Sequence, residues 1–107
     1  MSLDFCLEQR IYTSVFSKNI THNLGEMAEK AGIYKHLWAP EDINIKKAKQ
    51  LIKPLKKALA DLKARPDYYK QFDAKNGWGL YIHFVPFVEE VLDNCINYPN
   101  SNIRVSR

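Results

Sequence analysis

The sequence predicts an α+β domain dominated by helices, in which three or four helices pack with a short antiparallel ribbon formed by the N- and C-terminal segments. Two segments, residues 44–65 and 80–97, carry apolar side chains at helical spacing. Segments near both chain ends alternate apolar and polar residues, which is typical of strands. A chain of 107 residues is too short for two stable cores, so residues 1–107 are expected to form a single compact domain.

The first predicted strand covers residues 5–15. Its apolar and β-branched side chains alternate with polar ones and stand at Phe5, Leu7, Ile11, Thr13 and Val15. Residues 17–19 predict a turn after it, because Ser, Lys and Asn in succession favour a chain reversal. Residues 1–3 resemble a cloning remnant, so they are not expected to contribute to the fold.

A short helix is predicted to open at Thr21-His22-Asn23. Either Thr21 or Asn23 can cap it, and Asn23 is followed three residues later by Glu26 in a variant of the capping box. Gly32 stands where a helix commonly ends in a left-handed conformation.

Residues 34–40 are predicted to be a connector, with the start of a helical turn at 40–42. The long helix follows at 44–65, with an apolar stripe at Ala48, Leu51, Ile52, Leu55, Ala58, Leu59 and Leu62. Pro54 lies inside this helix and is expected either to kink it or to split it in two. One further helical turn is predicted at 67–72.

Residues 76–79 predict a turn, and the last helix runs from 80 to 97. Its wide apolar face is formed by Leu80, Phe84, Phe87, Val88, Val91, Leu92 and Cys95. Pro86 is expected to bend its start, and residues 98–100 end it. Residues 102–106 alternate again, which predicts a short closing strand beside the first one.

Several motifs resemble those of one protein family. They are Ile20-Thr21-His22-Asn23-Leu24-Gly25-x-Met27-Ala28, Ala31-Gly32-Ile33-Tyr34, Leu37-Trp38, Asn76-Gly77-Trp78-Gly79-x-Tyr81 and Val105-Ser106-Arg107. Together, from about residue 19 to the end, they resemble a family of small hypothetical proteins found in bacteria and their phages. That family has no assigned activity, so the resemblance transfers no catalytic or binding residues. It implies a cytoplasmic accessory protein, with a prophage origin as one option.

Composition argues against several classes of protein. No apolar run reaches the roughly 18 to 20 residues that a membrane span needs, so a cytoplasmic protein without a membrane partner is expected. Cys6 and Cys95 lie almost a chain length apart, which predicts two buried, reduced thiols rather than a zinc site or a disulfide. Glu89 and Asp93 are four residues apart but lack a histidine partner at metal-binding spacing, so neither a metal nor a cofactor is expected.

The predicted long helix is strongly basic on its polar side. Between residues 43 and 60 the chain has six lysines and no acidic residue, and Lys46, Lys49, Lys53, Lys56 and Lys57 are candidates for anion binding, with Lys47 beside them. Three interpretations stay open: a solvated exterior, an anion or nucleic-acid surface, or a face paired with the acids of the last helix. The cations are all lysine and no aromatic residue lies between 43 and 67, which favours the solvated exterior.

A second candidate site is a pocket. Its proposed lining is His22, Asn23, Trp38, Trp78 and Tyr81, because a helix start can bind anions, a histidine there can transfer protons, and the neighbouring glycines leave space around Trp78. The alternative is that Thr21 and Asn23 only cap the helix, while both tryptophans close a small core.

No catalytic residue can be identified from the sequence. The leading expectation is a non-enzymatic binding or accessory module, with a protein, a nucleic acid or a small anion as its partner. The competing hypothesis is a small enzyme or ligand-binding protein that uses His22, Asn23 and Trp78. A third hypothesis is self-association as a homodimer.

Overall fold

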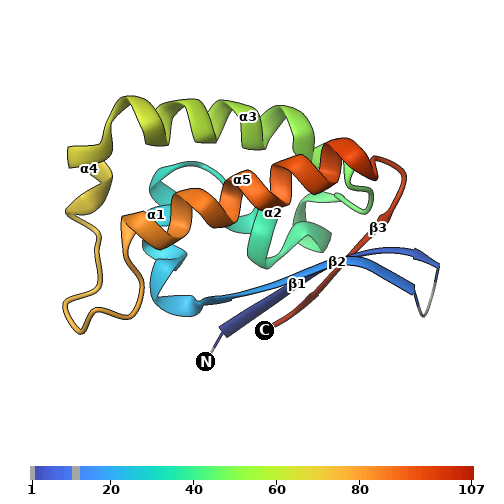
Figure 1. The fold of residues 1–107 in the computed structure, drawn as a ribbon, viewed down its shortest axis with the longest axis horizontal. Helices are drawn as coiled ribbons and strands as arrows, with labels where there is room; N and C mark the ends of the chain where they lie inside the picture. The colour runs from blue at the N-terminus through green and yellow to red at the C-terminus, as the bar shows by residue number, and fades with distance from the viewer. Residues whose placement is uncertain (1, 11–12) are drawn as a thin grey trace.

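A computed structural model describes residues 2–10 and 13–107, and it confirms the helix-dominated α+β fold (Figure 1). Three strands form one antiparallel sheet in the order β2-β1-β3. Their bounds are Ser2–Arg10 for β1, Thr13–Thr21 for β2 and Asn102–Ser106 for β3. The predicted ribbon of the two chain ends is present, because β1 pairs with β3 and places Phe5 opposite Val105.

The predicted single strand at 5–15 and the turn at 17–19 are wrong. β1 ends at Arg10, and β2 returns antiparallel to it from Thr13. Alternation of apolar and polar residues looks the same before and after such a reversal, and no glycine, asparagine or proline marks it. The predictions for Ile11 and Tyr12 fall outside the described residues.

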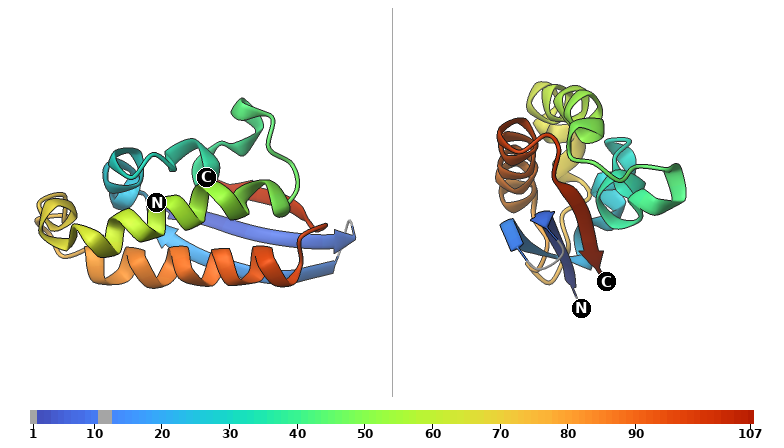
Figure 2. Two further views of the ribbon diagram at one scale, coloured as in Figure 1. Left: turned by 90° about the horizontal axis from the view of Figure 1, so that it is seen from above. Right: turned by 90° about the vertical axis from the view of Figure 1, so that its right-hand side faces the viewer.

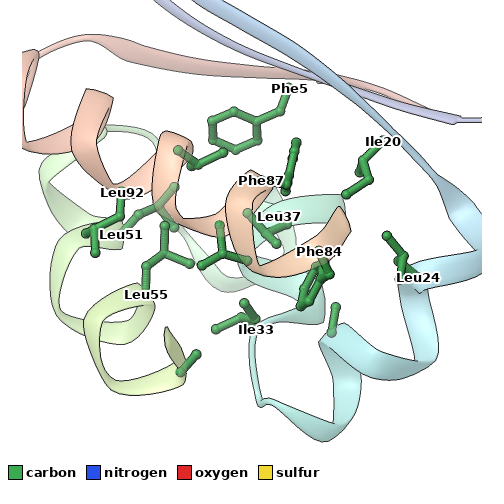
Figure 3. Close-up of a cluster of buried hydrophobic side chains, with 14 of the residues drawn as sticks. Phe5, Ile20, Leu24, Ile33, Leu37, Leu51, Leu55, Phe84, Phe87 and Leu92 are labelled. Atoms are coloured by element: carbon green, nitrogen blue, oxygen red, sulfur yellow. The ribbon is translucent and has the colours of Figure 1, made fainter. Parts of the chain in front are cut away.

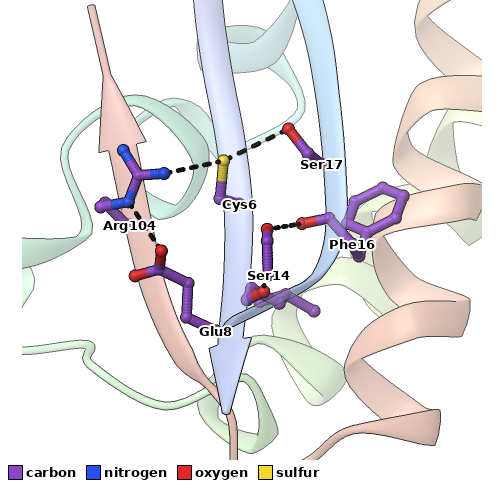
Figure 4. Close-up of polar contacts among 7 residues, drawn as sticks. Cys6, Glu8, Ser14, Phe16, Ser17 and Arg104 are labelled. Atoms are coloured by element: carbon purple, nitrogen blue, oxygen red, sulfur yellow. Dashed lines mark hydrogen bonds and ion pairs between the residues drawn. The ribbon is translucent and has the colours of Figure 1, made fainter. Parts of the chain in front are cut away.

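One face of the sheet is apolar and the other is polar. On β1, the side chains that point toward the helices are fully buried: Leu3, Phe5 and Leu7. Leu3 is therefore part of the core, and the prediction that residues 1–3 do not contribute to the fold is wrong at this position. On the polar face, the Cys6 thiol lies 3.3 Å from Ser17 Oγ and 3.7 Å from Arg104 Nη2, and Arg104 donates to Glu8 at 3.1 Å (Figure 4).

Both thiols are buried and unpaired, as predicted. Burial in the apolar core raises the pKa of the Cys95 thiol to about 12, so it stays a neutral thiol at physiological pH.

The helical elements follow in chain order: η1 His22–Leu24, α1 Gly25–Lys30, α2 Tyr34–Trp38, η2 Pro40–Ile43, α3 Lys49–Ala64, α4 Pro66–Lys70 and α5 Tyr81–Asn97. The last helix, the closing strand, the turn at 76–79 and the left-handed Gly32 (φ 80°) agree with the sequence predictions. The connector predicted at 34–40 instead contains α2, whose five residues are too few to show a helical period.

The long helix begins at Lys49 rather than at residue 44. Asn44 has a left-handed backbone (φ 58°) that interrupts the helical path. Lys46 O accepts from Ile103 N at 2.9 Å, and Lys47 forms an isolated bridge with Asn102, so this segment extends the edge of β3. α3 then runs without a break through Pro54, which therefore does not split it.

The core lies between the sheet and the helices and joins all the long elements. Figure 3 shows Phe5 of β1 in one cluster with Phe84 and Phe87 of α5 and Leu51 and Leu55 of α3. Figure 2 shows α3 and α5 side by side, with the strands beyond α5. The predicted leucine stripe of α3 is confirmed at its centre, while Ile52 and Leu59 are only partly buried. Among the described residues, no helix is long and apolar enough to cross a membrane.

Candidate functional site

The most exposed large apolar side chain in the described part of the chain is Trp78, at 72% exposure. It stands in the turn between α4 and α5. Its backbone is fixed on both sides, because Asn23 Nδ2 donates to Trp78 O at 2.8 Å and Trp78 N donates to Asn76 Oδ1 at 2.9 Å. The turn is closed further by Ala74 N, which donates to Gly79 O at 2.9 Å. Because these hydrogen bonds already hold the backbone of the turn, little backbone entropy is lost when a ligand contacts the exposed ring.

Gly79 explains how this turn comes so close to the start of η1. Its φ is +119°, a conformation that side-chain-bearing residues rarely adopt. A Cβ at this position would lie 2.9 Å from Asn23 Cβ and 3.3 Å from Thr21 Cγ2. The glycine therefore serves to dock the turn on Thr21 and Asn23. Gly77, by contrast, has a positive φ of 80° and open space around it.

A surface cleft of about 710 Å³ opens beside the Trp78 ring. Its walls are the start of β1, the end of β2, η1, the turn at 76–79 and the first turn of α5. Among the described residues, no aspartate, glutamate, lysine or arginine lines it, although these residue types make up 26% of the chain. Its polar lining consists of neutral amides and hydroxyls together with one imidazole: Ser2, Asn19, Thr21, Asn23, Asn76 and His83.

Some of these polar groups already have partners. Asn19 Nδ2 donates to Ser2 Oγ at 2.8 Å and to Asp4 Oδ1 at 2.7 Å. Asn23 Oδ1 and Asn76 Nδ2, however, make no hydrogen bond to any described residue. Among the polar groups that the cleft offers beside its aromatic surface are therefore the free Asn23 acceptor and the free Asn76 donor.

The structure brings together only part of the predicted pocket. Asn23 and Trp78 line the cleft, whereas His22, Trp38 and Tyr81 do not. Trp38 is 2% exposed and stacks on Tyr34 with ring centres 5.3 Å apart. The Tyr81 hydroxyl donates to the backbone oxygen of Leu62 at 2.7 Å, so it joins α5 to α3.

The His22 side chain is hydrogen-bonded to a residue of the core. Its Nδ1 accepts a hydrogen bond from Trp38 Nε1 at 2.8 Å, which satisfies the polar atom of an otherwise buried indole. Asn23 does not form the predicted capping box with Glu26, since α1 has no side-chain cap. Thr21, the other predicted cap, is confirmed, because its hydroxyl accepts from Asn23 N at 3.2 Å. His83 lines the cleft but was not predicted to, since its position depends on how the turn folds back on β2.

We expect replacement of His22 by alanine to destabilise the protein by about 1–2 kcal/mol, because the Trp38 indole N–H loses its acceptor. The matched control is His83→Ala, which removes an exposed histidine that has no hydrogen-bond partner in the described residues and is expected to change stability by less than about 0.5 kcal/mol. Urea unfolding followed by circular dichroism measures both. Equal stabilities would show that the His22–Trp38 contact contributes nothing.

The strongest interactions among titratable groups lie elsewhere, where α3 meets α4. Arg65 donates to both carboxylate oxygens of Asp61, at 3.0 and 2.6 Å, and the Tyr69 hydroxyl also donates to that carboxylate. These hydrogen bonds lower the pKa of Asp61, while burial and the nearby carboxylate raise the pKa of Tyr69 to about 12. Tyr69 is fully buried, so the three groups connect two helices and none of them lines the cleft.

The cleft has the parts for binding but not an evident catalytic pair. His83 makes no hydrogen bond to a carboxylate in the described part of the chain. No group of three histidine, cysteine, aspartate or glutamate residues within ranges 2–10 and 13–107 is placed to hold a metal ion.

The lysines of α3 have few acidic neighbours. Lys63 forms an ion pair with Glu89 of α5 at 2.9 Å. The other α3 lysines, at Lys49, Lys53, Lys56 and Lys57, are exposed and have no carboxylate within 4.0 Å among the described residues. Pairing of this face with the acids of α5 is therefore confined to Lys63. Lys46 is also exposed, but it lies before the helix.

The chain matches no protein-family model, no curated protein and no solved structure. The resemblance to a family of bacterial and phage proteins therefore stays a prediction.

Proposed function

We propose that this protein is a non-enzymatic binding module whose site is the cleft beside Trp78. The observation that carries the proposal is an exposed indole on a turn held by hydrogen bonds, next to a cleft without formal charge. Tryptophan left in water forgoes a large gain from apolar burial, and it commonly dominates the binding energy of the sites that contain it.

The lining favours an uncharged polar ligand with a flat apolar face, the chemistry of sugar rings and nucleobases. Within the described residues the cleft has neither a lysine nor an arginine to pair with a bound anion. A cation could use the indole face, but among the described residues no carboxylate and no second large aromatic ring lines the cleft. A neutral ring stacked on Trp78 can instead meet the acceptor of Asn23 and the donor of Asn76.

The proposal is tested by titrating the protein with neutral probes, such as N-acetylglucosamine, glucose, uridine and adenosine. Indole and side-chain amide signals in ¹⁵N NMR spectra report binding. At least one probe is expected to shift the signals of the Trp78 indole and the Asn76 amide in a saturable way. Trp78→Ala should weaken this binding by roughly 10- to 100-fold, since stacking of one ring on an aromatic side chain contributes about 1–3 kcal/mol.

Tyr68→Ala is the control, because Tyr68 is another exposed aromatic residue and lies outside the cleft. Its binding is expected to equal that of the unmodified protein. If no neutral probe shifts the Trp78 signal, or if Trp78→Ala binds as tightly as Tyr68→Ala, the cleft is not the site.

A further inference from the structure

The solvent side of α3 is a basic surface that the proposed ligand cleft does not use. We call Lys49, Lys53, Lys56 and Lys57 the lysine face. At 100° per residue these four side chains, with Lys63, occupy an arc of about 120° that contains no acidic and no aromatic residue. Over residues 46–65 the chain carries eight lysines and arginines against one aspartate, so the remainder of this +4 chain is net negative.

The charges of this helix are arranged unfavourably for an isolated protein. Lys53 is spaced at three or four residues from Lys49, Lys56 and Lys57, so like charges stand next to one another on the helix surface. Lys49 is the first residue of α3, so its charge lies at the positive end of the helix dipole. The first turn contains no acidic residue to offset it. No described carboxylate lies within 4.0 Å of the lysine face, and Asp61, one turn after Lys57, is bonded to Arg65 and Tyr69 instead. An anionic partner lying along α3 would relieve both unfavourable arrangements.

We propose that the lysine face binds the phosphate backbone of double-stranded nucleic acid. Lysine–phosphate contacts gain affinity from counterion release, which requires no apolar surface. The four lysines span about 12 Å of the helix axis, enough to follow roughly three or four base pairs at 3.4 Å each. Figures 1 and 2 show α3 on the side of the molecule opposite the sheet, where an extended partner can approach it.

Other polyanions fit this surface less well. A protein interface needs a desolvated apolar or aromatic centre, whereas the small apolar residues here are only Ala60 and Ala64. A helix that lies on a membrane inserts an apolar face, but the apolar stripe of α3, including Leu51 and Leu55, is buried in the core. Single strands are normally gripped by aromatic stacking, and the lysine face has no aromatic ring. It also has no arginine to read bases, so the contact is independent of sequence.

The test is fluorescence anisotropy with labelled 20-base-pair DNA and RNA duplexes of mixed sequence, at 50 and 200 mM salt. Four phosphate contacts give a logarithmic salt slope near −3.6, so affinity is expected to fall on the order of 100-fold between these conditions. In the variant Lys49→Gln/Lys53→Gln/Lys56→Gln the slope should shrink by about 3, and binding at 50 mM salt should be nearly lost.

The matched control is Lys30→Gln/Lys35→Gln/Lys75→Gln, which removes three exposed charges outside α3 and has the same net charge. It is expected to keep most of the duplex affinity. No duplex binding at 50 mM salt, or equal losses in the two triple variants, overturns the proposal. It is also overturned if single-stranded oligonucleotides, polyglutamate or phosphatidylserine vesicles bind the lysine face more tightly than the duplexes do. Because these lysines lie outside the Trp78 cleft, the outcome is independent of the neutral-ligand test.

Discussion

Replacing Phe84 by alanine is expected to lower the free energy of unfolding by about 3–5 kcal/mol. Phe84 is fully buried on the inner side of α5, where Figure 3 shows it among side chains from the other elements of the core. Truncation removes a large apolar surface and leaves a cavity that the surrounding helices can fill only in part. A domain of this size has a total stability of about 5–15 kcal/mol, so the variant should be close to the limit of folding.

Ile82→Ala is the matched control for this experiment. Ile82 lies on the same helix but is 62% exposed, so its replacement is expected to change stability by less than about 0.5 kcal/mol. Urea unfolding followed at 222 nm compares the two variants. A loss below about 1 kcal/mol for Phe84→Ala would mean that α5 does not pack as described.

Replacing Gly79 by alanine is expected to destabilise the protein by about 2–5 kcal/mol, from backbone strain together with a steric clash. The backbone φ of +119° disfavours any side chain, and the added Cβ would meet Asn23 Cβ at 2.9 Å. Both atoms sit close to the main chain, so neither can swing away. We expect the turn to separate from η1 and the hydrogen bond from Asn23 to Trp78 O to break.

Gly77→Ala separates the two causes, because Gly77 has a positive φ of 80° but open space where the Cβ would go. Only the strain remains there, at about 1–2 kcal/mol. Unfolding curves measure the stabilities, and the Asn23 side-chain amide signal in NMR spectra reports whether the turn is docked. If both variants are equally stable and keep that signal, the close contact of Gly79 with Asn23 is not a constraint on the fold.

The sequence predicted the elements whose period is expressed over many residues. The apolar stripes of α3 and α5 recur over several helical turns, and they identified Leu51, Leu55 and Phe84 as core. The five residues of α2 are too few to show such a period, and the alternation of β1 continues into β2 without a marker of the turn. Both elements were missed because no local signal separates them from their surroundings.

Of the residues that line the cleft, the sequence predicts only those with a distinctive local context, Trp78 and Asn23. The glycines on both sides of Trp78 predict an accessible ring, and the position of Asn23 at a helix start predicts that it lines the pocket. The same argument predicts that His22 lines the pocket, yet its imidazole accepts a hydrogen bond from Trp38. His83 had no distinguishing neighbour in the sequence, although it lines the cleft.

What the sequence alone determined is therefore the fold class, the two long helices with their buried sides, the basic side of α3, the closing strand and the two buried thiols. These follow from local patterns, since each residue's face is set by its distance along one helix or strand. Only the tertiary structure decided that β1 lies between its two partners and that Trp78 meets Asn23, 55 residues earlier. The same holds for the lysine face, which has no carboxylate within 4.0 Å in the described part of the chain. Such contacts depend on how elements far apart in the chain pack against one another, and the periodicity within one element does not predict that packing.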